Sequence, residues 1–246
     1  MITPSPLLIP SLDLPWLWLG LAYLLGALPF AVWVGQKAGK DPRSTGSKNP
    51  GASNVARTAG IRWGLVTLIL DALKGAIIPW LILGGYLISK PVINTDGQYL
   101  NWSFDLIEWA SFAGIISVLG HITSPFLAFK GGRGVATALG AMFALHSGVA
   151  LVTMFIWLIV LMLTRIPAWS SLALALAFIL LSQSVVVSDA VRIFAVCTSA
   201  LIVIRHWTHL EKLLRPMQQK TFATGLSSKK SKTIKNTHKK RKKSNR

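Results

Sequence analysis

Residues 41–60 carry the side chains that best suit binding of a phosphate group. This first basic segment reads DPRSTGSKNPGASNVARTAG and separates the apolar runs 16–34 and 63–88. Its glycines and Pro50 permit tight turns that expose backbone amides, and phosphate oxygens accept several such donors at once. The segment is therefore a candidate phosphate site, with an ordinary basic loop of a membrane protein as the alternative. Its candidate ligands are Gly46, Ser47, Asn49, Gly51, Ser53, Asn54 and Arg57.

A second basic segment, residues 130–134, reads KGGRG and precedes an apolar run in which a helix is expected to begin at Val135. A phosphate at such a helix start would gain backbone amides and the positive end of the helix dipole. One glycine-rich cationic segment is a weak signal, whereas two on the same side of a membrane are a much stronger one. The candidate ligands here are His121, Lys130, Gly131, Gly132 and Arg133.

The composition places both segments in an all-α integral membrane protein. Of the 246 residues, 52% are hydrophobic and 14% are charged, and long runs without charge exclude a water-soluble domain. We expect about seven transmembrane helices, with a kink at Pro29. The expected spans are 16–37, 62–88, 105–119, 135–164 in two halves that turn at 146–148, 167–187 and 189–204.

The distribution of positive charge predicts the orientation and organisation of the chain. The positive-inside rule puts the first basic segment in the cytoplasm, the N-terminus outside and the C-terminus in the cytoplasm. We expect a lead-in (1–15), a transmembrane domain (16–218) and a disordered polybasic tail (219–246). Residues 220–246 hold 11 of the 26 Lys and Arg residues and no acid. This tail is predicted to bind anionic membrane lipid or to remain solvated, and nothing in it indicates recognition of nucleic acid.

Two charged residues inside the second span are further candidates. Asp71 and Lys74 are three residues apart, which places both on one face of a helix. Asp71 lies about 14 Å into the span. Charge at that depth must face the bundle interior or a wet cavity, where it has a function or forms an ion pair between helices.

Histidines after the last span are candidates for binding an anion or for acid–base chemistry. His206 and His209 are three residues apart and share a face. No third ligand is in sight, so we expect neither a metal nor another cofactor. A nucleophile pair of Ser47 with His121 or His206 is formally available. Asp41 is the only nearby acid that could complete it, and we therefore expect Ser47 to act as a hydrogen-bond donor.

Together these segments resemble the bacterial acyl-phosphate:glycerol-3-phosphate acyltransferases of the PlsY type. The resemblance covers about residues 16–218, and its motifs are highly specific in combination. The matching residues are Arg43, Gly46, Ser47, Asn49, Gly51, Ala52, Asn54 and Arg57, then Asp71, Lys74 and Gly75, then Gly120, His121, Pro125, Phe129, Lys130, Gly131, Gly132, Gly134, Val135, Ala136 and Thr137, and finally His206.

Some positions depart from the family pattern. Ser53 stands for Thr and keeps the hydroxyl, and Arg133 stands for Lys and keeps the charge in a different shape. Lys48 stands where Gly is usual. In the last motif His209 replaces Asn and Gln218 replaces Glu, so turnover or specificity could differ from the family's.

The resemblance implies transfer of a fatty acyl group from acyl phosphate to the sn-1 hydroxyl of glycerol 3-phosphate, giving lysophosphatidic acid and phosphate. It implies a site on the cytoplasmic face of the bacterial inner membrane, and the enzyme that produces acyl phosphate is a further candidate partner. The alternatives are a catalytically altered paralogue with a scaffolding role and an organic-phosphate transporter. The expected catalytic residues are Ser47, Arg57, Lys130 and His206. The other candidates of the two segments are expected to bind substrate, together with Asp71, Lys74, His121 and His209.

Overall fold

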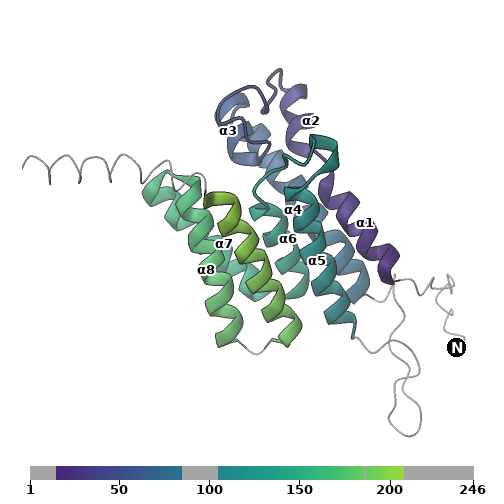
Figure 1. The fold of residues 1–246 in the computed structure, drawn as a ribbon. Coiled ribbons are helices and arrows are strands. Elements are labelled where there is room, and N and C mark those ends of the chain that lie inside the picture. Colours follow the sequence, from purple (N-terminus) through teal and green to yellow (C-terminus); the bar gives the residue numbers. More distant parts are fainter. Residues whose placement is uncertain (1–14, 85–104, 186, 208–246) are drawn as a thin grey trace, which may run out of the picture. The chain divides into compact units, whose positions relative to one another are not determined.

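The computed structural model describes residues 15–84, 105–185 and 187–207, which contain helices and no strand. It divides the chain into two units, Met1–Arg205 and His206–Arg246, and the fold below is that of the first. The predicted lead-in, apart from Pro15, and the predicted tail lie outside the described residues. The helices in Figure 1 are α1 (Pro15–Ala27), α2 (Phe30–Lys37), α3 (Ala52–Ala59), α4 (Ile61–Leu83), α5 (Leu106–Ile122), the 3₁₀ turn η1 (Pro125–Leu127), α6 (Val135–Leu145), α7 (Ser147–Thr164), α8 (Pro167–Ser184) and an unlabelled last helix, Asp189–Trp207.

Six helical stretches among the described residues are long and apolar enough to cross a membrane. α6 is apolar but has only 11 residues, about 16 Å at 1.5 Å per residue, which is about half the hydrocarbon thickness. The described residues are thus helical as predicted, with helices suited to a membrane. Six of the seven expected spans have the required length, and the orientation of the termini stays a prediction. The six stretches are Trp16–Lys37, Ile61–Leu83, Leu106–Leu127, Ser147–Thr164, Pro167–Ser184 and Asp189–Trp207.

The first span breaks at Pro29, as the sequence predicts. α1 ends before this proline and α2 begins after it, because proline has no N–H with which to continue the helix. Neighbouring side chains bind the carbonyls at the end of α1. Ser124 Oγ donates to the carbonyl of Ala27 (2.6 Å), and Lys74 Nζ donates to the carbonyl of Leu28 (2.9 Å). The broken span is thereby joined to α4 and to the turn that follows α5.

The long apolar run after the second basic segment divides at His146, within the stretch where a turn was predicted. The backbone of His146 is extended between α6 and α7, with φ −157° and ψ 93°. Its ring Nδ1 accepts the backbone N–H of Val149 at 3.2 Å, which caps the first turn of α7. The run therefore forms two helices, as expected.

α5 continues three residues beyond its predicted end. The expected span ended at Leu119, whereas α5 extends to Ile122. Gly120 serves close packing instead, because a Cβ there would lie 2.2 Å from the carbonyl oxygen of Tyr23 in α1. His121 consequently lies on a helix and not in a loop.

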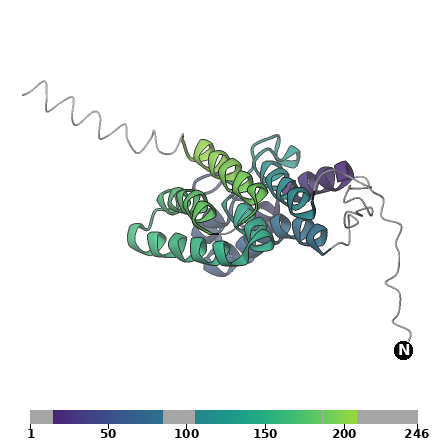
Figure 2. The same ribbon diagram turned by 90° about the horizontal axis from the view of Figure 1, so that it is seen from below.

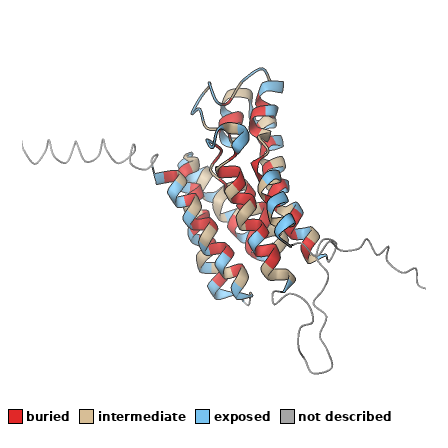
Figure 3. Cartoon of the chain, turned by 45° about the vertical axis from the view of Figure 1, so that its right-hand side comes forward, coloured by how far each residue is buried: buried red, intermediate tan, exposed pale blue. Residues whose placement is uncertain are grey.

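Glycines bring the backbones of α4 and α6 into contact. A Cβ on Gly75 of α4 would lie 2.1 Å from the carbonyl oxygen of Thr137, and one on Gly140 of α6 would lie 1.9 Å from that of Ala72. Figure 3 shows buried residues along the inward faces of the helices. Lipid tails are as apolar as the side chains, so close packing of this kind is a main source of attraction between membrane helices.

The last helix packs against α8. Ser199 Oγ donates to the carbonyl of Ala175 (2.8 Å), and Arg192 Nε donates to the carbonyl of Ser182 (3.3 Å). Figure 2 shows the two helices side by side from below. These bonds join the last helix to α8.

The substitution Gly140→Ala tests the contact between α4 and α6. We expect it to lower the free energy of unfolding by about 1–3 kcal/mol, because the added methyl overlaps a backbone carbonyl that cannot move freely. Gly20→Ala in α1 is the matched control, since a Cβ there has nothing within 4 Å. Thermal unfolding of the two variants in the same detergent measures the difference. Equal melting temperatures would contradict the packing described here.

Candidate active site

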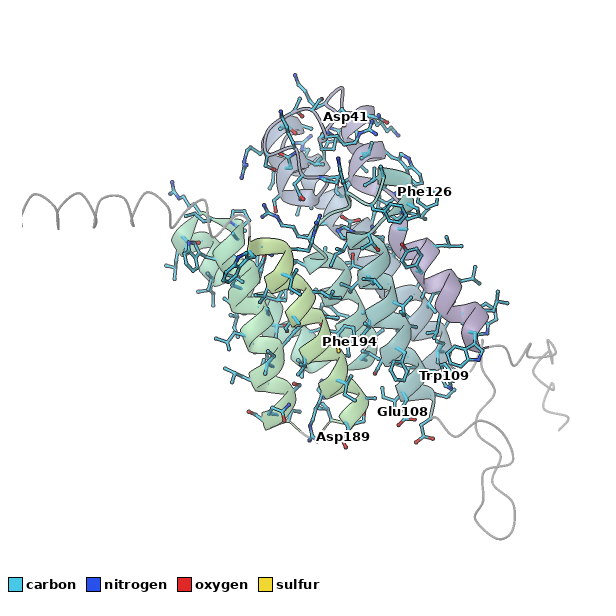
Figure 4. The ribbon with its side chains drawn as sticks, in the orientation of Figure 1. Asp41, Glu108, Trp109, Phe126, Asp189 and Phe194 are labelled. Atoms are coloured by element: carbon cyan, nitrogen blue, oxygen red, sulfur yellow. The ribbon has the colours of Figure 1, made fainter. Side chains whose placement is uncertain are left out.

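The two basic segments meet at one end of the helices. Figure 4 shows Asp41 of the first segment and Phe126, shortly before the second, at the same end, with Glu108 at the other. The contact is direct, because a Cβ on Gly132 would lie 3.0 Å from the carbonyl oxygen of Pro50. The structure thus brings together two sets of residues that are about 80 positions apart in the sequence.

Asn54 shapes the first basic segment from within. Its side chain is buried, its Oδ1 accepts the backbone N–H of Ser47 (2.8 Å), and its Nδ2 donates to the carbonyls of Pro42 (2.8 Å) and Thr45 (3.0 Å). Gly46 has a φ of +61°, and a Cβ there would lie 2.3 Å from Asn54 Oδ1. Both amide hydrogens of Asn54 are therefore occupied. In this structure Asn54 holds the loop, and its expected role as a substrate ligand stays a prediction.

Asp41 and Arg43 pair with each other at the start of the segment. Arg43 Nη2 lies 2.7 Å from Asp41 Oδ2, and Arg43 Nε lies 3.1 Å from both carboxylate oxygens. This contact lowers the pKa of Asp41 to about 2, because the guanidinium favours the ionised carboxylate. The acid considered for a Ser47–His pair is thereby engaged elsewhere, which favours Ser47 as a hydrogen-bond donor.

The backbone of the second basic segment is bound to the end of α5. The N–H of Gly131 donates to the carbonyl of Ile122 and the N–H of Gly132 to that of His121, both at 3.1 Å. A Cβ on either glycine would lie about 2 Å from an atom of His121. In this structure the amides of Gly131 and Gly132 are thus engaged by α5, and the role of the two glycines in binding substrate stays a prediction. These glycines let the segment pack on α5, and α6 begins at Val135 as predicted.

Three guanidinium groups gather where the segments meet. Burial, and then the neighbouring charges of Arg205 and Arg57, lower the pKa of Arg133. In the part of the chain that the structure describes, no acid forms an ion pair with any of these three arginines. The acids that do form ion pairs have other partners. Like charges without a carboxylate between them are the arrangement expected of a site for an anion.

Several predicted ligands present free side chains at this end. Within the described residues none of these side chains has a hydrogen-bond partner, so each retains its donors for a ligand. These side chains are those of Asn49, which is partly exposed, and of Ser47, Ser53, Arg57 and Lys130, which are exposed.

Asp71, Lys74 and His121 form a buried cluster. Lys74 Nζ lies 2.8 Å from Asp71 Oδ1, so the pair shares one face of α4 as predicted. His121 Nδ1 lies 3.7 Å from the same oxygen, which is too far for a hydrogen bond. The ion pair forms within α4, and not between helices as the alternative interpretation expected.

A small cavity connects this cluster with the basic segments. Asp71, Lys74 and His121 line it together with Pro50 and Gly132, and it has room for about one water-sized sphere. A glycerol phosphate is much larger than this space. The three side chains lie beneath the basic segments, and their expected contact with substrate stays a prediction.

Arg205 is a residue of the site that the sequence analysis missed. Its Nη2 donates to the carbonyl of Gly131 (2.8 Å), and its Nε donates to that of Gly132 (3.3 Å). In the sequence it is one basic residue at the end of an apolar run, beside a histidine that has more obvious chemistry. The hydrogen-bond partners of Arg205 lie more than 70 residues away in the sequence, so no local pattern reveals them. Its position next to His206 was the only indication in the sequence that it belongs to the site.

The predicted histidines of the last motif fall at and beyond the limit of the description. His206 belongs to the second unit, where its side chain is 1% exposed. His209 and Gln218 lie outside the described residues. The roles of all three stay predictions.

Replacing one member of the buried ion pair should be more harmful than replacing both. We expect Lys74→Met alone to lower the free energy of unfolding by about 3–5 kcal/mol, because it leaves the Asp71 carboxylate buried without its cation. Lys74→Met combined with Asp71→Leu should be closer to wild type. Thermal unfolding of both single variants and the double variant in detergent measures the coupling. Additive losses would show that the pair is not coupled.

Comparisons with known proteins agree with this arrangement. A family model described as glycerol-3-phosphate acyltransferase matches residues 16–216. The glycerol-3-phosphate acyltransferase of Bordetella petrii is 42% identical over 170 residues, which are 68% of this chain and 71% of that protein. That of Aquifex aeolicus is 36% identical over 194 residues, covering 78% of this chain and 92% of the relative.

Solved structures give the same result. The crystal structure of PlsY, an integral membrane glycerol 3-phosphate acyltransferase, in its glycerol 3-phosphate form has a TM-score of 0.71 and 31% sequence identity to this chain. The match covers 82% of this chain and 92% of that one. The lysophosphatidic acid form of the same protein matches with a TM-score of 0.69. With its two basic segments in contact at one end of apolar helices, the chain belongs to the glycerol-3-phosphate acyltransferase family, of the PlsY type.

Proposed function

We propose that this acyltransferase uses acyl phosphate as its donor and acylates the sn-1 hydroxyl of glycerol 3-phosphate, giving lysophosphatidic acid and phosphate. Membership of the family indicates that glycerol 3-phosphate is the acceptor. The donor is supported by the charge of the site, because acyl phosphate, glycerol 3-phosphate and the released phosphate all present phosphate oxygens. The observation that carries the proposal is the contact between the two basic segments at Gly132 and Pro50, whose arginines Arg57 and Arg133 have no acidic partner among the described residues.

The chemistry needs little from the protein beyond binding and orientation. The acceptor oxygen forms a bond to the acyl carbon, and the bond from that carbon to the phosphate oxygen breaks. The proton of the hydroxyl passes to the departing phosphate. Acyl phosphate is already activated, so no covalent nucleophile of the enzyme is required, and Ser47 serves as a donor. Catalysis rests on positioning and on stabilisation of negative charge.

The exposed donors divide between the two segments. Ser47, Asn49, Ser53 and Arg57 of the first segment cradle one phosphate, and Lys130 and Arg133 of the second supply further positive charge. His206 binds glycerol phosphate or helps to deprotonate its hydroxyl, which is the role proposed from the sequence. Asn54 holds the backbone of the first segment in place.

We place the protein in the inner membrane of a bacterium, with the basic segments facing the cytoplasm, where glycerol 3-phosphate is dissolved. The distribution of Lys and Arg supports this orientation. In the proposed organisation, residues 16–218 form the acyltransferase domain and residues 219–246 form a tail that binds anionic lipid. The enzyme that makes acyl phosphate remains a proposed partner.

The substitution Arg57→Ala tests the cradle. Purified protein supplied with palmitoyl phosphate and glycerol 3-phosphate should release phosphate and lysophosphatidic acid. Arg57→Ala should lower kcat/KM by about tenfold to a hundredfold or more, because one charged contact to phosphate contributes about 1.5–3 kcal/mol. Arg62→Ala is the matched control, an exposed arginine five residues further along, and should keep wild-type activity. Full activity of Arg57→Ala would discredit the cradle.

The same assay decides between donors and between functions. Palmitoyl-coenzyme A in place of palmitoyl phosphate should give no product with the purified protein. Product from the thioester and none from the phosphate would overturn the proposed donor. No product from either donor, with exchange of labelled glycerol phosphate across vesicles, would favour a transporter.

A further inference from the structure

Arg205 binds the second basic segment with two adjacent donors of one guanidinium group. Its Nη2 donates to the carbonyl of Gly131 at 2.8 Å and its Nε to the carbonyl of Gly132 at 3.3 Å. The planar guanidinium presents these two N–H groups in a fixed geometry, so the pair of bonds fixes orientation as well as distance. Lysine could not reproduce both bonds, because its ammonium is a point charge at the end of a flexible chain.

The same two residues are bound from the other side by α5. The N–H groups of Gly131 and Gly132 donate to carbonyls at the end of that helix, both at 3.1 Å. The segment is therefore held by α5 through its amides and by the last helix through its carbonyls. Without Arg205 the carbonyl side of the segment would lose its hydrogen bonds to the described part of the chain, and the position of the adjoining Arg133 would no longer be fixed.

Arg205 lies near other positive charges, so something must hold it there against their repulsion. Its charge, like that of Arg57, lowers the pKa of Arg133. Like charges at such a separation oppose one another, and the described residues supply no acid to compensate. The carbonyl dipoles of the segment are the attraction that holds Arg205 in place, and a bound anion would relieve the remaining repulsion.

We propose that Arg205 is a positioning residue of the acyltransferase: it clamps the carbonyls of Gly131 and Gly132 and thereby holds Lys130 and Arg133 where they meet the phosphate of the substrate. The inference rests on the proposed function of the basic segments as the phosphate site. It adds a contribution from the last helix that acts through the backbone and does not require Arg205 to touch substrate.

The test compares three variants of the purified, full-length protein. Arg205→Ala should raise KM for glycerol 3-phosphate by about tenfold or more, since two charged hydrogen bonds to the segment are lost. Arg205→Lys should recover only part of the loss. Arg192→Ala is the matched control, because Arg192 lies in the same helix and also donates its Nε to a backbone carbonyl, that of Ser182. It should keep the wild-type KM.

Chemical rescue separates positioning from general support of the fold. Guanidinium or methylguanidinium at millimolar concentration should restore much of the activity of Arg205→Ala, because it can bridge the two carbonyls. Ethylammonium at the same concentration should restore little. A wild-type KM in either Arg205 variant, or equal rescue by guanidinium and ethylammonium, would overturn the proposal.

Calorimetry of glycerol 3-phosphate binding, without an acyl donor, tests the role of Arg205 separately from the proposal that acyl phosphate is the donor. If wild-type protein binds it but does not acylate it from palmitoyl phosphate, the proposed donor fails and the role of Arg205 is still tested. Weaker binding to Arg205→Ala, with unchanged binding to Arg192→Ala, then supports the clamp. Equal binding to all three proteins overturns it.

Discussion

The packing of the bundle depends on one buried cation. Lys74 Nζ pairs with Asp71 at 2.8 Å and donates to the carbonyl of Leu28, and its own carbonyl accepts Ser117 Oγ of α5 at 3.0 Å. The next residue, Gly75, carries the backbone contact with α6. A buried ammonium must have its charge and its hydrogen bonds satisfied together. This requirement holds α4 against the broken end of the first span, near the end of the bundle that carries the basic segments.

Several backbone groups of the two basic segments are already hydrogen-bonded within the protein. Asn54 binds three groups of the first segment, and α5 and Arg205 bind both faces of the second. On the proposed function, the side chains that remain for a ligand are the free donors Ser47, Asn49 and Ser53 and the cations Arg57, Lys130 and Arg133. A rigid backbone with unpaired cations is preorganised for an anion, because the site needs little rearrangement when the anion binds.

Local chemistry in the sequence was enough to predict the helical frame and to select two basic segments that the structure brings into contact. Pro29 breaks a helix whatever surrounds it, and the spacing of Asp71 and Lys74 fixes a shared face. The features that were missed depend on contacts between distant residues. Gly120 could have ended a helix, and only its contact with α1 shows why it does not. Arg205 has no pattern of its own, because its partners lie more than 70 residues away.

The aromatic residues beside the cations relate the site to the lipid boundary. Phe126 and Phe129 are 55% and 67% exposed, and Lys130 follows directly. Exposed rings next to positive charge are typical of the interface between headgroups and hydrocarbon. On the proposed function, the chain of an acyl phosphate would lie in the bilayer while its phosphate meets Lys130 and Arg133, and glycerol 3-phosphate would reach the same residues from water. The two substrates can therefore meet without either leaving the phase in which it is soluble.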